Sequence, residues 1–533
     1  STSLLLVLTY ITVANYAEAA NILIIIPFSS KSHYIMLRPI GLEMAKRGHN
    51  VTVITAIKEP NPPANYHEVL VEYKEIWDVM GDNNSTINFS PIRVLMCSIT
   101  GAEFLNDVLW MGGLAFTEVA LNSSNFQEFL KADNSYDLIF NEQFFQESFN
   151  VLAHKYNAPL VVASTLGNCM KHNFVIGNPL QLNTIIFEIL TIRDHTSIWD
   201  RLRNIYATVY EYVWWKYWYL DKQEALAQKY IPGLKKPVPR LFEMQKYISL
   251  LFINTHFSFD TPIALLPNVI EIAGIHTTQN SNTSLPKDLQ NILDNATDGV
   301  VYMNFGSNVR ISEMDENKKT AIFNVFRKLK QTVLMKWEVD ILENKPDNVI
   351  ARKWFPQRDL LAHPNIRVFI SHGGLIGTQE AIFHGVPILG VPIYGDQYNN
   401  LDLANKHGFG KIVEFQNICE KTFGEALNEM LADKSYKENA EKMSKRFKDR
   451  PMSPLDTTIW WLEYVIRNNG AHFMKSPSIN MGWFKYFMLD IYLVVLTTIM
   501  VLIYFLVASF KIVRFFFSRF IRSKVQIMKK KRL

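Results

Sequence analysis

The sequence predicts an α/β protein in which two Rossmann-like domains face each other across a cleft, followed by one C-terminal transmembrane helix. Three observations predict this fold. Short apolar runs of strand length alternate with longer helical segments in both halves of the chain, as in parallel sheets covered by helices. The chain has 533 residues, of which 48% are hydrophobic, so it is long enough for more than one core. A charge-free apolar stretch near the end is long enough to cross a bilayer.

The first residues, 1–19, are predicted to be a signal peptide. An apolar run at residues 4–11 is followed by Ala17-Glu18-Ala19, the small residues that a signal peptidase prefers, and we expect cleavage after Ala19. An ordinary first strand is the alternative, but residues 22–27 form a better strand.

An N-terminal domain is predicted over residues 20–262. Its first strand is followed by a loop that contains His33, by a helix at residues 37–47 and by Gly48, which ends that helix. A second strand completes a βαβ unit, and such units build parallel sheets. The predicted strands of this domain are residues 22–27, 51–55, 137–140 and 160–163.

A second domain is predicted over residues 263–482, after a loop region at residues 261–268. Ligands of such sheets bind at the carboxyl ends of the strands, so a cleft between the two domains is the expected binding site. The predicted strands are residues 299–304, 331–335, 349–351, 368–371 and 387–391.

The C-terminal region is predicted to be a transmembrane helix, residues 483–510, with a basic tail, residues 511–533. Residues 491–510 contain no charge and would span about 30 Å as a helix, although a buried core helix is the alternative. The basic tail predicts a type I protein with lumenal domains. The final Lys530-Lys531-Arg532-Leu533 resembles a dilysine signal for retrieval to the endoplasmic reticulum, and a lipid-facing basic tail would look similar.

Charge and cysteine content exclude two classes of function. The tail holds nine of the 55 basic residues, which leaves 46 against 50 acidic residues elsewhere, so no nucleic-acid partner is expected. Three scattered cysteines, Cys97, Cys169 and Cys419, match no metal spacing, although one disulfide is possible. A homo-oligomer is not excluded. Sequons that fit a lumenal glycoprotein lie at Asn83, Asn84, Asn88, Asn122, Asn282 and Asn295.

The densest group of motifs lies between Trp354 and Gln397. WFPQ is followed by LLAHP, FISHGGLIGTQEA, HGVP and PIYGDQ. This string resembles the signature of the UDP-glycosyltransferase family. The resemblance extends to both halves of the chain and to the C-terminal membrane anchor. It implies a GT-B fold and inverting transfer of a hexosyl group from a UDP-sugar to a hydroxyl of a small lipophilic acceptor, with no permanent cofactor and no metal.

The same residues predict an anion site on physical grounds. A strand runs into Ser371-His372-Gly373-Gly374, and a helix is expected to begin near Gly377. Glycines let the backbone approach an anion, and a helix N-terminus presents unpaired N–H groups to it, so a diphosphate fits there. The resemblance implies UDP-sugar contacts for Ser307, Trp354, Gln357, His372, Gly373, Gly374, Gly377, Thr378, Glu380, Asp396 and Gln397.

Individual roles in this site follow from the resemblance. Trp354 would stack on uracil, Gln357 would bond its edge, and Glu380 would accept hydrogen bonds from the ribose, unless it is only an exposed helix carboxylate. Asp396 and Gln397 would hold the sugar hydroxyls.

Two positions depart from the family pattern. Lys336 stands in a segment where family members often carry arginine, so a nucleotide contact there is doubtful. Ile376 replaces the asparagine of many vertebrate relatives, which removes one potential phosphate donor.

His33 is the predicted catalytic base. Sugar transfer needs a group that removes the acceptor proton, and a histidine at the cleft edge suits this role, although a surface loop histidine is the alternative. The family supplies an aspartate partner after a later strand, and here the position that matches by spacing is Glu142.

Two questions remain open, the identity of the sugar donor and the class of protein. The signature looks closest to invertebrate members, so UDP-glucose is the expected donor and UDP-glucuronate the alternative, in detoxification or secondary metabolism. A non-catalytic membrane receptor or carrier for lipophilic ligands is the alternative class. The aromatic segment at residues 205–220 could lie against a membrane, close part of an acceptor pocket or form a core helix.

Overall fold

The computed structural model describes residues 19–74, 99–190, 192, 196–277, 285–307, 309–340 and 342–531. The expected signal peptide, apart from Ala19, and the sequons at Asn83, Asn84, Asn88 and Asn282 therefore lie outside the described residues, as does Cys97. The chain forms two compact units, Ser1–Lys475 and Ser476–Leu533.

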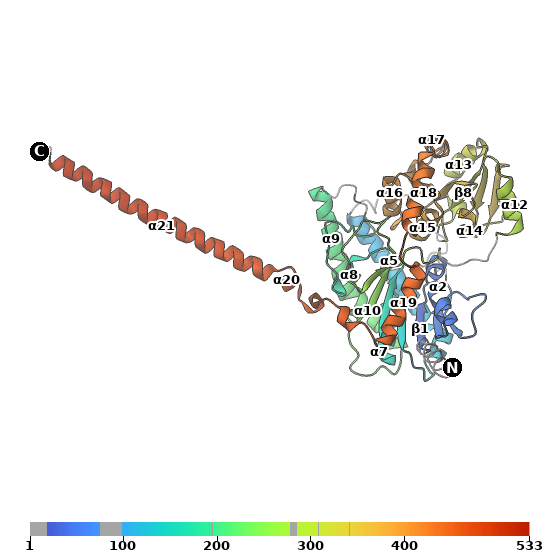
Figure 1. The fold of residues 1–533 in the computed structure, drawn as a ribbon, viewed down its shortest axis with the longest axis horizontal. Coiled ribbons are helices and arrows are strands. Elements are labelled where there is room, and N and C mark those ends of the chain that lie inside the picture. The colour runs from blue at the N-terminus through green and yellow to red at the C-terminus, as the bar shows by residue number, and fades with distance from the viewer. Residues whose placement is uncertain are drawn as a thin grey trace, which may run out of the picture. The chain divides into compact units, whose positions relative to one another are not determined.

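The first unit contains two parallel sheets, each with its own helices (Figure 1). The first sheet has seven strands in the order β3-β2-β1-β4-β5-β6-β7. Its inner strands are runs such as NILIII and LVVAS, almost wholly buried, as expected for strands with helices on both faces. The strands are β1 (Asn21–Ile26), β2 (Asn50–Thr55), β3 (Tyr66–Leu70), β4 (Leu138–Glu142), β5 (Leu160–Ser164), β6 (Leu250–Ile253) and β7 (Val269–Glu271).

The helix after β1 differs from its prediction. It begins at Lys31 rather than at residue 37, so His33 lies in the first turn of a helix and not in a loop. The helices of this domain are α2 (Lys31–Lys46), α5 (Ile99–Asn122), α6 (Ser124–Phe129), α7 (Val151–Tyr156), α8 (Met170–Val175), α9 (Ile198–Trp214), α10 (Leu220–Tyr230) and α11 (Leu241–Gln245), with a π-helical turn, η2 (Trp215–Tyr219), between α9 and α10.

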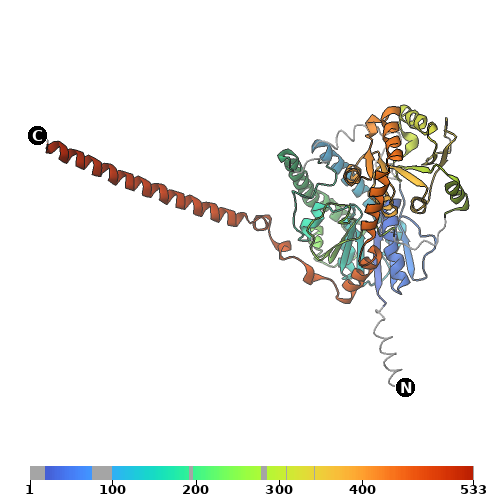
Figure 2. The ribbon, with the colours of Figure 1, turned by 45° about the horizontal axis from the view of Figure 1, so that its top comes forward.

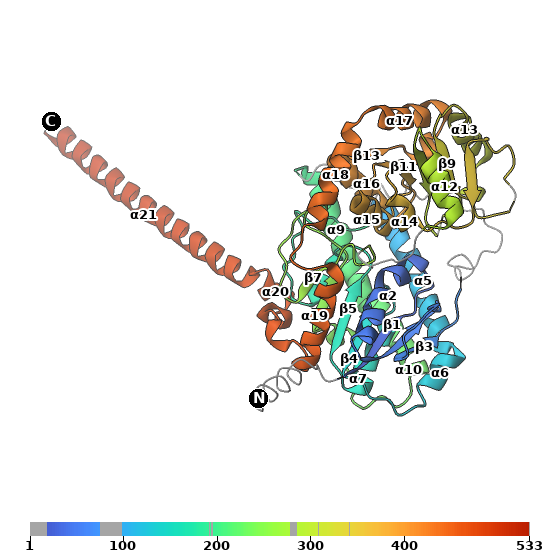
Figure 3. The ribbon, with the colours of Figure 1, turned by 45° about the vertical axis from the view of Figure 1, so that its right-hand side comes forward.

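The second sheet has six parallel strands in the order β10-β9-β8-β11-β12-β13, and Figure 3 shows it above the first. The strands are β8 (Val300–Asn304), β9 (Thr332–Lys336), β10 (Val349–Arg352), β11 (Ile366–Ser371), β12 (Ile388–Gly390) and β13 (Gly410–Ile412). The helices are α12 (Lys287–Asn295), α13 (Glu316–Arg327), α14 (Gln357–Leu361), α15 (Leu375–His384), α16 (Gln397–Lys406), α17 (Glu420–Ala432) and α18 (Ser435–Lys448).

The first domain extends beyond the predicted boundary at residue 262. Strand β7 still belongs to the first sheet. Helix α19 (Pro454–Arg467), which follows the second domain in sequence, packs against α2, and Ile459 and Leu462 lie in the core of the first sheet. Figure 2 shows this orange helix beside the blue one. The end of the first unit thus returns to the domain where the chain began.

The second unit contains one long helix, α21 (Leu489–Lys530), after the short α20 (Trp483–Tyr486). Its most apolar window has a mean hydropathy of 2.7, so the helix is long and apolar enough to cross a membrane. Forty-two residues make a helix about 63 Å long, roughly twice the hydrocarbon core of a bilayer. Residues 489–510 of the predicted span and residues 511–530 of the basic tail therefore form one continuous helix, while residues 483–486 belong to the separate helix α20.

Candidate active site

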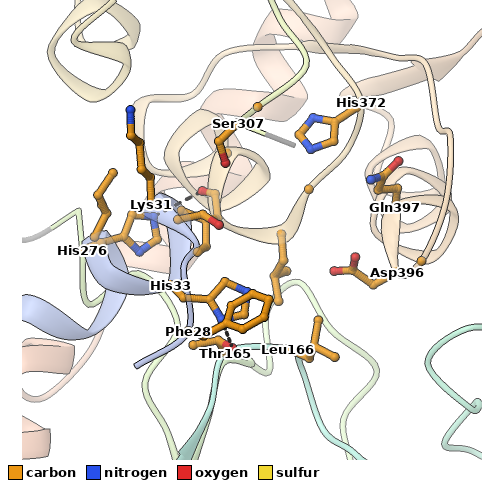
Figure 4. Close-up of a pocket in the computed structure, with 18 of the residues that line it drawn as sticks. Phe28, Lys31, His33, Thr165, Leu166, His276, Ser307, His372, Asp396 and Gln397 are labelled. Carbon is orange, nitrogen blue, oxygen red and sulfur yellow. Dashed lines mark hydrogen bonds between the residues drawn. The ribbon is translucent and has the colours of Figure 1, made fainter. Parts of the chain in front are cut away.

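A cavity of about 760 Å³ lies in the first unit, where side chains after the strands of both sheets face each other. We call it the central cavity. Figure 4 shows His33 and Thr165 on one side, and Ser307, His372, Asp396 and Gln397 across from them. Both domains therefore contribute side chains to a single site.

His33 and Glu142 form a hydrogen-bonded pair at the edge of the first sheet. Glu142 ends β4 and is fully buried, and its Oε1 accepts from Nδ1 of His33. The His33 side chain is 12% exposed and lines the cavity. Because the carboxylate occupies Nδ1, Nε2 remains as the basic nitrogen that can take a proton.

Thr165 is a third member of this group that the sequence analysis did not find. Its hydroxyl lies 3.0 Å from both His33 Nδ1 and Glu142 Oε1. It directly follows β5, so its place at the carboxyl end of a strand was the signal that could have identified it. Thr165 helps to fix the imidazole relative to the carboxylate.

The wall around His33 is aromatic. The rings of Phe28 and Phe144 lie 5.1 and 4.4 Å from the His33 ring, centre to centre, and Phe116 lies 4.9 Å from Phe28. These four side chains line the cavity together. An apolar surface beside a basic nitrogen suits a hydroxyl carried on a lipophilic body.

The opposite wall contains the N-terminus of α15. The helix begins at Leu375, two residues before the predicted start, and its N-cap is Gly374, which has no side chain to pair with the first-turn N–H groups. Leu375, Ile376 and Gly377 line the cavity. The first-turn N–H groups of such a helix can bind a phosphate without a side-chain donor at position 376.

His372 lies directly before this helix and is buried at the cavity wall. Burial, with a contribution from Lys336, lowers the pKa of His372 to about 4, so its imidazole is neutral near pH 7. A neutral imidazole can still donate one N–H to a phosphate oxygen.

Lys336 supports the loop that follows β8 and contains Gly306 and Ser307. Its side chain is 8% exposed, and its ammonium donates to the carbonyl of Gly306 at 2.5 Å, while Glu338 lies 3.6 Å away. Gly306 has a φ of +77°, which favours glycine, and precedes Ser307 at the cavity. Lys336 thus positions the Ser307 loop from behind.

Gln357 and Glu380 bond each other. Gln357 Nε2 donates to Glu380 Oε2 at 2.6 Å, and Gln357 Oε1 accepts from Asn304 at 2.6 Å and from Tyr302 at 3.1 Å. Burial raises the pKa of Glu380 to about 7, despite the opposing bond from Gln357. Glu380 is therefore not the exposed helix carboxylate considered as its alternative.

Trp354 is 52% exposed and meets a side chain from the first domain. The ammonium of Lys31, the first residue of α2, lies 5.1 Å from the centre of the Trp354 ring. A cation over an indole is an attractive contact, and this one connects the two walls of the cavity.

Asp396 and Gln397 lie where α16 begins, across the cavity from His33 in Figure 4. Gln397 Oε1 accepts from the N–H groups of Ile393 and Tyr394, so its amide nitrogen is the group that can donate to a ligand. Asp396 accepts from Asn400 at 2.8 Å, and burial raises its pKa. A carboxylate beside an amide donor suits the recognition of sugar hydroxyls.

Two predicted residues lie outside the described cavity wall. Gly373 has a φ of +89°, and a Cβ there would lie 2.5 Å from Leu401, so this glycine permits close packing beneath the loop. Thr378 is completely buried in α15. The lining includes the other predicted donor residues: Ser307, Trp354, Gln357, His372, Gly374, Gly377, Glu380, Asp396 and Gln397.

Substitution of Gly374 tests the anion site. A Cβ at this position would lie 2.7 Å from Nε2 of His372, so Gly374→Ala must displace the imidazole. Loss of one hydrogen bond to a charged phosphate costs about 1.5–3 kcal/mol, so we expect KM for the UDP-sugar to rise at least ~10-fold with KM for the acceptor unchanged. Initial rates at varied donor and acceptor concentrations measure both. Gly167→Ala, whose Cβ would make an ordinary contact at 3.6 Å, is the control.

Solved structures with this arrangement are glycosyltransferases of the GT-B fold. The structure of "UDP-glucose: anthocyanidin 3-O-glucosyltransferase in complex with UDP" covers 85% of this chain and 100% of its own, with a TM-score of 0.54 and 17% sequence identity. The calicheamicin glycosyltransferase CalG4 covers 84% and 99%, with a TM-score of 0.53 and 17% identity. The fold is thus that of a GT-B glycosyltransferase.

The sequence comparisons define the family. The profile described as "UDP-glucoronosyl and UDP-glucosyl transferase" matches residues 21–527, and the chain belongs to this family. It is 31% identical to UDP-glycosyltransferase UGT5 of Dactylopius coccus, over 93% of each chain. It is 29% identical to human UDP-glucuronosyltransferase 2B7, over 86% of this chain and 87% of the relative. The protein is therefore a UDP-glycosyltransferase.

Proposed function

We propose that this enzyme transfers glucose from UDP-glucose to a hydroxyl of a small lipophilic acceptor and forms a β-glucoside by inversion. The observation that carries the proposal is the position of the His33–Glu142 pair across the cavity from the N-terminus of α15. A base and an anion site on opposite walls suit a reaction in which an oxygen attacks while a diphosphate departs.

The proposed mechanism uses the residues of both walls. Nε2 of His33 removes the proton of the acceptor hydroxyl, and Glu142 stabilises the resulting imidazolium through Nδ1. The oxygen attacks the anomeric carbon from the face opposite UDP. The N–H groups at the start of α15, with His372, stabilise the charge that develops on the diphosphate, so an α-linked donor yields a β-glycoside.

The charges near the sugar site support a neutral hexose. Glu188 lines the same cavity and lies close enough to Asp396 to contribute to its raised pKa. Among the described lining residues, Lys31 lies over Trp354, Arg38 pairs with Glu59, and Arg358 pairs with Asp359. Lys171, whose ammonium lies 3.7 Å from Glu188, partly balances that carboxylate, so Asp396 is the acidic side chain that would oppose a glucuronate carboxylate, and we favour glucose over glucuronate.

The test is UDP release by microsomes that express the chain, with UDP-glucose or UDP-glucuronate and a panel of phenols and lipophilic alcohols. Acceptor-dependent release with UDP-glucose is the expected result. Preference for UDP-glucuronate would overturn the donor assignment. Binding of UDP-glucose without turnover of any acceptor would favour a receptor or carrier.

We also propose that the enzyme is a type I protein of the endoplasmic reticulum membrane, with its catalytic domains in the lumen. Support comes from α21 and from the basic residues that follow its apolar part. Asn122 and Asn295 are exposed, as lumenal glycosylation sites would be. Protection of both domains from protease in intact microsomes is expected, and digestion without detergent would contradict this topology.

The raised pKa of Glu380 predicts pH-dependent nucleoside binding. If the ionised carboxylate accepts hydrogen bonds from the ribose, the affinity for the nucleoside is highest at pH values above the Glu380 pKa of about 7. The affinity falls as the pH drops through this value and the carboxylate becomes protonated. We expect uridine, which has no phosphate to titrate, to bind about tenfold more weakly at pH 6 than at pH 8, because the ionised fraction of the carboxyl falls by that factor. Calorimetric titration of the full-length protein measures this. Glu380→Gln should abolish the dependence, and a persistent dependence in that variant would refute the assignment.

A further inference from the structure

Helix α9 presents a stripe of large apolar side chains to the surface of the first unit. Apart from two adjacent pairs, these residues recur every three or four positions, so they share one face of the helix. A soluble helix normally carries polar residues on its outer face, and an exposed apolar patch of this length indicates an interaction surface. The α9 stripe, continued into η2, consists of Ile198, Trp199, Leu202, Ile205, Tyr206, Val209, Val213 and Tyr217, each between 39% and 74% exposed.

The opposite face of α9 fixes this orientation. The Asn204 amide donates to the carbonyls of Leu182 and Ile185 at 2.8 Å and accepts from the N–H of Phe187 at 2.8 Å. Two turns further along, buried Glu211 pairs with Lys171 at 2.5 Å. Rotation of α9 to bury the stripe would break all of these buried contacts, so the stripe faces outward as a fixed property of the fold.

The chemistry of the stripe matches a lipid–water interface. Trp199, Tyr206 and Tyr217 combine an apolar body with a polar tip, as in the aromatic belts of membrane proteins. Exposed Arg201 adjoins the stripe, and the ammonium of Lys216 lies 4.9 Å from the Tyr217 ring. Long cationic side chains at the edge of an apolar surface can extend toward head groups. This mixture is typical of helices that lie in the plane of a membrane surface.

The chain itself indicates which lipid surface is available. It contains α21, which is long and apolar enough to cross a bilayer, and only residues 476–488 lie between the first unit and that helix. We propose that the α9 stripe lies in the lipid–water interface of the membrane that holds this enzyme. The inference rests on the proposed function in one respect, because the acceptor is taken to be lipophilic.

The position of α9 gives this contact a role in acceptor supply. Glu211 on its inner face lines the central cavity, while the stripe forms its outer face. Helix α9 is therefore the layer between the lipid surface and the acceptor side of the cavity. In this proposal, a lipophilic acceptor that partitions into the bilayer enters the cavity from the lipid beside this helix.

The test places a fluorescent label on the stripe of the full-length protein. Cys97 and Cys419 are replaced by serine, buried Cys169 is kept, and Tyr206→Cys is labelled with an NBD dye in phosphatidylcholine vesicles. Lys131→Cys, on an exposed side chain of the same domain, is the control. We expect doxyl-labelled lipid, but not iodide in the water, to quench the label at position 206. At position 131 we expect iodide, but not doxyl-labelled lipid, to quench it.

Two outcomes would overturn the proposal. Iodide quenching at position 206 equal to that at position 131 would show that the stripe faces water. Protection from both quenchers would show that protein covers it. Neither result depends on turnover, so UDP release by the same samples reports separately on the proposed function.

A paired kinetic test examines acceptor supply. Leu202→Glu with Val209→Glu puts two charges on the stripe without touching the cavity lining. We expect KM for a bilayer-partitioning alcohol to rise about fivefold, with KM for UDP-glucose and for a water-soluble phenol unchanged. Equal effects on both acceptors would refute supply through the lipid.

Discussion

Replacement of His33 by alanine is expected to lower kcat for glycosyl transfer about 10³-fold, because a positioned general base contributes about 10²–10⁴ to the rate. His33 is the group that joins Glu142 to the cavity, and among the described residues no other histidine is bonded to that carboxylate. UDP release from UDP-glucose with a phenolic acceptor measures the effect. UDP affinity should change less than twofold, since the anion site lies on the opposite wall.

The control for this experiment is His67→Ala. His67 is exposed on β3 of the same sheet and does not line the described cavity, so its loss should leave kcat within twofold of wild type. A wild-type kcat in His33→Ala, with UDP binding intact in both variants, would reject the proposed base and leave the family assignment untouched.

Glu142→Gln is expected to lower kcat about 10²-fold or more. The amide has nearly the shape of the carboxylate but cannot stabilise an imidazolium, and its NH₂ group can hold His33 in the wrong tautomer. Glu142→Asp keeps the charge, but its side chain is one methylene shorter and its carboxylate lies farther from His33 and Thr165. We therefore expect an intermediate kcat. Single-turnover measurements with saturating UDP-glucose isolate this step from donor binding.

Glu128→Gln is the matched control, because Glu128 is 74% exposed and pairs with Lys131 at the surface of the same domain. A purely structural role for Glu142 predicts that Gln and Asp variants lose activity together with thermal stability. Retained stability with lost turnover in Glu142→Gln, and partial recovery in Glu142→Asp, would separate catalysis from folding.

Much of the fold could be predicted because parallel strands are apolar on both faces. Each predicted strand, from residues 22–27 to residues 387–391, has a counterpart in the two sheets. Four strands were missed, β3, β6, β7 and β13; β6, Leu-Leu-Phe-Ile, is apolar but only four residues long, and β7 has only three residues. Strand β3, Tyr-His-Glu-Val-Leu, is an edge strand with polar residues, and β13, Gly-Lys-Ile, is too short to show any periodicity.

The site residues could be predicted only where they are adjacent in the sequence or match the family pattern. The string from His372 to Glu380 is contiguous, so its residues were identified together. Lys31 and Thr165 could not be assigned to the site from the sequence, because their partners Trp354 and Glu142 are distant in sequence and lie beside them only in the folded chain. Helix N-termini were also misplaced at α2 and α15: Ser30, the N-cap of α2, makes no side-chain cap hydrogen bond, and Gly374, the N-cap of α15, has no side chain to make one.

The return of α19 to the first sheet constrains how this protein is made. Ile459 and Leu462 complete the core beneath β1 and α2, yet they are synthesised after the entire second domain. At about 5–20 residues per second, the roughly 180 residues after β7 take the ribosome about 10–40 s to add. The domain that starts first therefore finishes last, and its unfilled apolar surface is exposed to chaperones throughout that interval.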